Sequence, residues 1–120
     1  MFKPTFSFID YTQDVTIAGK EFGIDCGSAT GEYLKAKSKE IRETAEMIAD
    51  EETDENAIVL LGTEIIEHVL GDGAAEEIFG ETDPDVNMVL DIVSFITITV
   101  SQFAVRRMEI LQGMVSNSDK

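Results

Sequence analysis

Hydrophobic positions near the start of the chain alternate with polar ones, which is the pattern of a half-buried strand. Two such segments, 15–18 and 21–24, flank a Gly-Lys loop at 19–20, whose leading glycine favours a type II′ hairpin turn. Residues two apart on a strand point the same way, so the apolar residues should share one face. The expected pairs are Ile17 with Phe22 and Val15 with Ile24. Phe6 and Phe8 also alternate with polar residues, which leaves room for a third strand before the hairpin.

From about residue 28 the hydrophobic period changes to that of amphipathic helices. Each helix carries an apolar stripe opposite a charged face and must therefore pack against another element. The expected helices are Thr30–Ala49, Asp54–Leu70, one or two turns within 73–79, and a long final helix from 84 to about Leu111. The expected apolar stripes are Leu34, Ile41, Ala45 and Ile48 in the first helix, and Ile58, Leu61, Ile65 and Val69 in the second.

Glycines and an Asp-Pro pair mark the ends of these helices. Gly71 can end the second helix in the left-handed conformation, which glycine adopts without strain, and Gly80 can close the short helix. Asp83 can cap the final helix while Pro84 occupies its first position. The final helix is therefore expected to begin at the proline.

The final helix contains a conflicting signal, because residues 96–100 alternate with a period of two and are rich in β-branched side chains. Helical spacing continues on both sides of this segment, so we interpret it as helix. At 100° per residue, the core face comprises Val89, Ile92, Val93, Ile96, Val100 and Phe103. Ile98 and Val105 point almost the opposite way, with Phe95 on the flank. These three residues form either a partner-binding seam or a second buried face.

These elements define an α+β fold that is mostly helical, with an N-terminal β-hairpin followed by about four helices, the last one long. A chain of 120 residues fits one domain whose core needs no disulfide or metal. We expect a single domain over 1–120, made of a hairpin region at 1–27, a helical region at 28–113 and a flexible tail at 114–120.

Acidic residues are concentrated in the middle of the chain, where the window 44–91 holds fifteen carboxylates and no lysine or arginine. This window accounts for the formal net charge of −15, because acidic and basic residues balance in the rest of the chain. A field of this sign repels phosphate backbones, so nucleic acid is not an expected ligand. The acidic window indicates either a basic protein partner or solvated helix faces.

Cysteine usage and hydropathy favour an intracellular compartment. The lone Cys26 cannot form an intramolecular disulfide, which favours reducing conditions. The N-terminus lacks the long apolar stretch of a signal peptide. The longest uncharged stretch, 92–105, contains five hydroxyl or amide residues and is expected to be too short and too polar to span a bilayer. We therefore expect a cytoplasmic protein with no membrane partner.

The sequence shows no complete motif for catalysis, cofactor binding or metal binding. Alternating carboxylates after Asp50 lack the turn glycine and the final glutamate of a calcium loop. The segment 71–73 begins like a dinucleotide site but lacks the third glycine and follows a helix. His68 and Glu64 could supply two metal ligands, yet no further histidine or cysteine partner completes a site. Cys26 is expected to pack as a small apolar side chain. No enzymatic activity, catalytic residue, cofactor or metal is therefore expected.

One segment in the second half of the chain has the features of a known family. It combines a Leu-Leu-Gly start at 60–62, a short Ala/Glu helix ending in Ile-Phe at 74–79, an Asp/Asn-containing linker, and the apolar run Leu-Asp-Ile-Val-Ser-Phe-Ile at 90–96. In these features it resembles the tail assembly chaperones of long-tailed bacteriophages. The resemblance implies an assembly factor of the host cytoplasm that binds the tape measure protein and tail tube subunits before they polymerise.

Three classes of function remain open. The first is a non-enzymatic assembly factor that keeps a larger, aggregation-prone protein soluble and could form homo-oligomers. The second is an acidic nucleic-acid mimic that inhibits a DNA-binding protein, and the third is a small enzyme with an unrecognised site. Glycine breaks in the acidic window argue against the regular charge ladder of a mimic. The assembly factor is therefore preferred, with Phe95, Ile98 and Val105 as its partner-binding residues.

Overall fold

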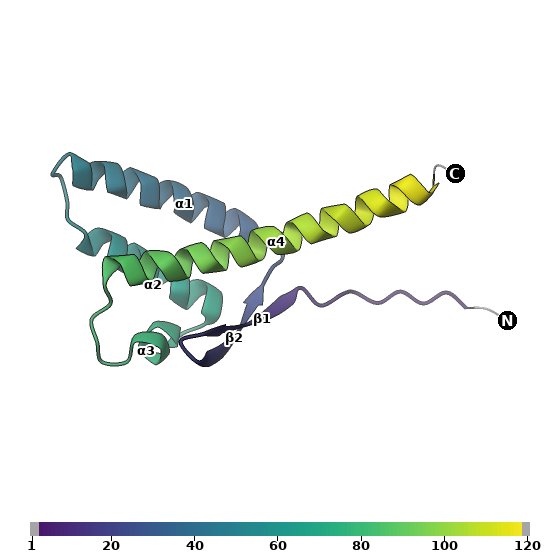
Figure 1. The fold of residues 1–120 in the computed structure, drawn as a ribbon, viewed down its shortest axis with the longest axis horizontal. Helices are drawn as coiled ribbons and strands as arrows, with labels where there is room; N and C mark the ends of the chain where they lie inside the picture. The colour runs from purple at the N-terminus through teal and green to yellow at the C-terminus, as the bar shows by residue number, and fades with distance from the viewer. Residues whose placement is uncertain (1–2, 119–120) are drawn as a thin grey trace.

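The computed structural model describes residues 3–118 and contains a two-stranded hairpin followed by four helices (Figure 1). The elements are β1 (Thr12–Ile17), β2 (Lys20–Asp25), α1 (Ser28–Ala49), α2 (Asn56–Leu70), α3 (Ala74–Phe79) and α4 (Val86–Ser118). This order confirms the predicted α+β class, mostly helical and with a long last helix.

The hairpin turns one residue earlier than predicted. β1 and β2 pair antiparallel with Val15 opposite Phe22 and Ile17 opposite Lys20, so the loop consists of Ala18 and Gly19. Both loop residues have positive φ, +53° and +78°, as in a type I′ turn, whose twist matches that of the flanking strands. The predicted pairs are wrong by two residues, but a shift of two keeps every side chain on its predicted face.

The third strand suggested by Phe6 and Phe8 does not form, because residues 3–11 lead away from the hairpin and have no strand edge beside them (Figure 1). Tyr11 is the residue at which this segment joins the hairpin, because the Tyr11 carbonyl accepts a hydrogen bond from the Cys26 N–H at 2.8 Å. Phe6 and Phe8 are 80% and 85% exposed. Their rings contact each other edge-on, with centroids 5.0 Å apart.

Gly71 ends α2 at the predicted residue but in a different conformation. Its φ of +109° is positive, yet its ψ of 160° lies outside the left-handed helical region. The chain turns at once into α3, where the Ala74 N–H donates to Glu67 Oε2 at 2.9 Å. Gly80 follows the last residue of α3 with φ +63°, so the predicted end of the short helix is confirmed.

Helix α4 begins after Asp85, so the predicted cap at Asp83 and the predicted start at Pro84 are wrong. Asp85 Oδ1 accepts a hydrogen bond from the Asn87 N–H at 2.8 Å, and the Asp85 carbonyl accepts one from the Val89 N–H at 3.1 Å. Residues 83–85 lie before the first helical residue, Val86. At the other end α4 continues to Ser118, so residues 114–118 of the expected tail are helical, and residues 119–120 lie outside the described part.

The core lies between α2 and the N-terminal half of α4, with the hairpin and α1 packed around them (Figure 1). The predicted core face of α4 is confirmed, and segment 96–100 is helical throughout. Its buried residues are Val89, Val93, Ile96 and Val100, with Ile92 and Phe103 half-buried. Ala45 is exposed, contrary to prediction, whereas Ile66 is fully buried although it lies off the predicted stripe. This extra burial arises because α2 packs against both α1 and α4.

Candidate functional site

The C-terminal half of α4 extends past the other helices and past the hairpin (Figure 1). Burial along α4 ends at Val100, and the side chains of residues 108–114 are exposed. Tyr11 packs against Phe103 with ring centroids 5.8 Å apart, and the Arg107 guanidinium lies 5.8 Å from the Tyr11 ring. The N-terminal segment therefore supports the base of this extension.

The three predicted seam residues, Phe95, Ile98 and Val105, are all exposed, at 42%, 54% and 55%. The alternative that they form a second buried face is therefore wrong. We call these three residues the seam. Ile98 and Val105 lie seven residues apart, which is two helical turns, and so face the same way.

A shallow groove accompanies the seam along α4. Beside the N-terminal half of α4 it lies between α1 and α4 and forms a depression of about 280 Å³. We call this part the α1–α4 groove, lined by Ser38, Ile41, Leu90, Ser94, Thr97 and Ile98. The depression continues on α4 alone past Ser101 and Val105 to Glu109. Ile98 thus lines both adjoining depressions and Val105 lines the second, whereas Phe95 lies outside them.

Several exposed apolar residues of this region escaped the sequence prediction. Met108, Ile110, Leu111 and Met114 are each between 47% and 62% exposed. The helix was expected to reach about Leu111, so only Met114 lies beyond its expected end, and the other three were not assigned to a surface. At 100° per residue the four lie within about 160° of one another, and this apolar stripe is the signal that could have found them.

Basic side chains lie near these depressions in an otherwise acidic protein. Arg106 of α4 lines the depression beside Val105, and Lys35 and Arg42 of α1 line a third depression between α1 and α4. None of these three residues forms an ion pair with any residue in the range 3–118. Six of the nine basic residues lie in the two short segments 35–42 and 106–107. The surface beside these depressions is therefore a local exception to the negative field of the chain.

His68 is a surface residue, as predicted, and it stacks on Tyr33 with ring centroids 3.7 Å apart. Glu64, its expected companion in a metal site, accepts instead from Lys37 Nζ at 3.3 Å. Hydrogen bonds from Lys37 to Glu40 and Glu64 raise the pKa of this lysine. Burial raises the pKa of the Tyr33 hydroxyl. This cluster ties α1 to α2.

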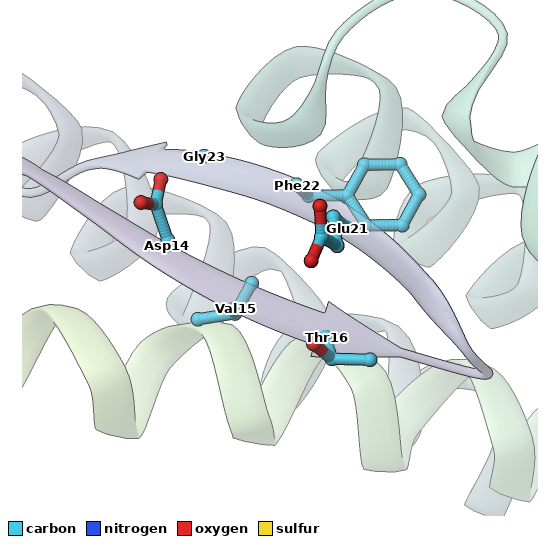
Figure 2. Close-up of a pocket in the computed structure, with 6 residues that line it drawn as sticks. All are labelled: Asp14, Val15, Thr16, Glu21, Phe22 and Gly23. Atoms are coloured by element: carbon cyan, nitrogen blue, oxygen red, sulfur yellow. The ribbon is translucent and has the colours of Figure 1, made fainter.

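The hairpin carries a depression of about 420 Å³ on its surface, lined by six residues of β1 and β2 (Figure 2). Asp14 and Glu21 supply its only charged groups, and both are exposed. General acid–base catalysis or nucleophilic attack needs a base or nucleophile oriented by a neighbouring group, which these six residues do not supply.

Cys26 is buried, as predicted for a small apolar packing residue. Its Sγ lies 3.5 Å from the Ile24 carbonyl oxygen. Burial, and next the Asp25 carboxylate, raise the pKa of the thiol, so the reactive thiolate is disfavoured. Within residues 3–118, no group of three or more His, Cys, Asp or Glu side chains is arranged to hold a metal ion.

By length and composition, the stretch Val86–Met114 of α4 could cross a membrane. The expectation that the uncharged stretch is too short to span a bilayer applies only to residues 92–105. The apolar part of α4 is longer, because the residues on both sides of this stretch are also apolar. A core helix that is mostly buried passes the same test, whereas 22% of the most apolar window of α4 is buried, although α4 supplies four buried residues to the core.

No known protein family, curated protein or solved structure matches this chain.

Proposed function

We propose that this protein is a non-enzymatic assembly factor that binds an apolar segment of a larger protein along α4, in the manner of a phage tail assembly chaperone. The observation that supports this function is the exposure of the apolar residues Met108, Ile110 and Leu111 of α4, together with the exposed seam. Exposed apolar residues that lie together on one element are typical of protein-binding surfaces.

The acidic window complements this surface. Its fifteen carboxylates lie between residues 44 and 91, whereas α4 from Ile92 to Met108 contains none. Only Glu64 of these fifteen joins an ion pair among the described residues, so no nearby basic side chain neutralises the charge of the others. A binder of aggregation-prone segments benefits from this division, because net charge keeps the complex soluble while the apolar face holds the partner.

Co-expression with the tail tube and tape measure proteins encoded by neighbouring genes tests the function. We expect a soluble complex that persists at high salt, because apolar contacts carry it. Ile98→Lys combined with Val105→Lys should abolish this complex. Leu60→Lys is the control, because Leu60 is a 64% exposed apolar residue of α2 and its substitution adds one positive charge, as each of the two seam substitutions does.

Three results would contradict the proposal. The first is the absence of any complex with either protein. The second is equal loss of binding in the Leu60 control. The third is steep salt dependence together with competition by DNA for a basic partner, which would indicate the nucleic-acid mimic instead.

A further inference from the structure

We propose that the depression between α2, α3 and the linker to α4 binds a basic segment of another protein, in which lysines or arginines flank a large apolar side chain. We call this depression the α2–α3 groove. It has a volume of about 560 Å³, compared with about 280 Å³ for the α1–α4 groove. It lies near the N-terminal end of α4, whereas the extension of α4 lies at the C-terminal end (Figure 1). The inference goes beyond the proposed function, because none of the seam residues lines this groove.

The floor of the α2–α3 groove is apolar. Its apolar lining residues are Val59, Leu60, Ala75, Phe79 and Pro84. Val59 and Phe79 are half-buried and pack against the core, whereas Leu60 is 64% exposed. A partner's apolar side chain that covers Leu60 removes apolar surface of both molecules from water, which favours binding.

The rim of the groove is acidic. Glu76 of α3 and Glu81 and Asp83 of the linker line it, and all three are exposed. None of them forms an ion pair with any residue in the range 3–118. No lysine, arginine or histidine lines the groove, so its negative charge has no local counterion from this chain. Lysines or arginines on both sides of the partner's apolar side chain would supply the missing positive charge.

The groove suits a protein segment better than a metal ion or a small molecule. Within the described part of the chain, no group of three or more His, Cys, Asp or Glu side chains is arranged to hold a metal ion, so the three carboxylates do not converge on one point. Small-molecule sites bury most of the surface of their ligand around a few oriented polar groups. The polar residues that line this groove are all exposed or half-buried. Separated carboxylates above an apolar floor instead match a chain that carries separated basic groups.

Hydrogen bonds within the chain hold the walls of the groove in place. The Ala74 N–H donates to Glu67 Oε2 at 2.9 Å, which joins the start of α3 to α2. The Thr82 N–H donates to the Phe79 carbonyl at 3.3 Å, which joins the linker to the end of α3. A surface that is already ordered loses little conformational entropy when a partner binds.

The seam and the α2–α3 groove have opposite charge surroundings. Lys35, Arg42 and Arg106 lie near the depressions along α4, whereas the window 44–91, which includes the whole lining of the α2–α3 groove, contains no lysine or arginine. A basic segment is therefore attracted to the groove and repelled by the basic side chains near the seam. Variants of each surface are thus controls for the other.

Fluorescence anisotropy of a labelled peptide tests the proposal. The probe contains two leucines flanked on both sides by arginines. We expect saturable binding that weakens as salt is added but persists, because screening removes the charge attraction and leaves the apolar contact. A peptide of equal charge with serines in place of the leucines should bind at least about tenfold more weakly. Equal binding of the two peptides would overturn the proposal.

Removal of carboxylates from the rim tests the place of binding. Glu76→Gln combined with Glu81→Gln should weaken peptide binding about three- to tenfold, because two exposed charge pairs are lost. Glu46→Gln combined with Glu52→Gln is the matched control, because it removes two exposed carboxylates of the acidic window that do not line the groove. Equal weakening by the two pairs would show that only net charge attracts the peptide, and would overturn the proposal.

The apolar contact is tested without a change of charge. Leu60→Ser should weaken binding about tenfold, whereas Met47→Ser, at a 43% exposed residue of α1 outside the groove, should have little effect. Circular dichroism melts check that both variants are folded. A dimer of the chain alone that Leu60→Ser dissociates would mean that a second copy occupies the groove, and would overturn the proposal.

The two proposals fail separately. Ile98→Lys combined with Val105→Lys should leave peptide binding nearly unchanged, because neither residue lines the α2–α3 groove. Loss of peptide binding in this double variant would place the peptide on the seam and overturn the groove site. The complex with tail proteins is assigned to α4, so substitution of Leu60 remains a control for it.

Discussion

Gly62 lies where α2 packs against Val89 of α4. A Cβ at this position would overlap the Cγ1 of Val89, which is fully buried and cannot move without disturbing the core. We therefore expect Gly62→Ala to lower the free energy of unfolding by about 1–3 kcal/mol through overpacking. Urea denaturation followed by circular dichroism measures the change.

Gly31 provides the matched control within α1. A Cβ added there meets no atom within 4 Å, and alanine is the better helix former. Gly31→Ala should therefore raise the free energy of unfolding by up to about 1 kcal/mol. If both alanine variants were equally stabilised, the close approach at Gly62 would be refuted.

The Cys26 thiol should be protected from alkylation in the folded protein. Its pKa is raised above the ordinary value of 9.0, so the unfolded chain loses the thiol proton first as pH rises. The stability contributed by this group is complete below that ordinary value and is lost as pH rises through the folded-state pKa. Iodoacetamide should react much more slowly in buffer than in urea, and equal rates would contradict the burial.

At the scale of single elements, the start of α4 depends on Asp85. Asp85→Ala removes the side-chain acceptor of the Asn87 N–H and should cost about 1 kcal/mol of stability. Asp83→Ala also removes one negative charge but no cap hydrogen bond, so it should change the stability by no more than about 0.5 kcal/mol. Thermal melts of the two variants distinguish them. A larger loss of stability in Asp83→Ala would indicate that Asp83 is the cap.

The two faces of α4 should respond differently to a charge. Ile96 is fully buried, so Ile96→Lys places an unpaired charge in the core and should cost several kcal/mol. Ile98→Lys and Val105→Lys lie on the exposed face and should leave the melt nearly unchanged. The melts are compared at low protein concentration, because loss of self-association would also lower the apparent stability. A large loss for both seam variants would mean that the seam is buried within one chain.

For the whole molecule, added salt should increase stability at neutral pH. The acidic window contributes fifteen carboxylates, of which only Glu64 is paired within residues 3–118. Screening of their mutual repulsion stabilises the compact state. The urea midpoint should therefore rise between low and high sodium chloride. A midpoint that stays constant or falls would show that the carboxylates are too dispersed to repel one another.

Local patterns by themselves determined most of the secondary structure. The alternation at 15–24 and the helical spacing after residue 28 are properties of neighbouring residues, so they identified the hairpin, the four helices and the core face of α4. These patterns do not determine the exact residue at which a helix or strand begins or ends. Asp83 and Asp85 are both able to cap a helix, and Gly19 fits either position of a two-residue turn, so composition alone could not choose between them.

Only the tertiary structure decided which apolar residues are covered. Ile96 and Ile98 are alike as residues, yet Ile96 is fully buried and Ile98 is 54% exposed. The reason is that α1, α2 and the hairpin are each shorter than α4 and cover one side of its first half (Figure 1). Burial depends on which elements lie beside a residue, and this depends on how the whole chain packs.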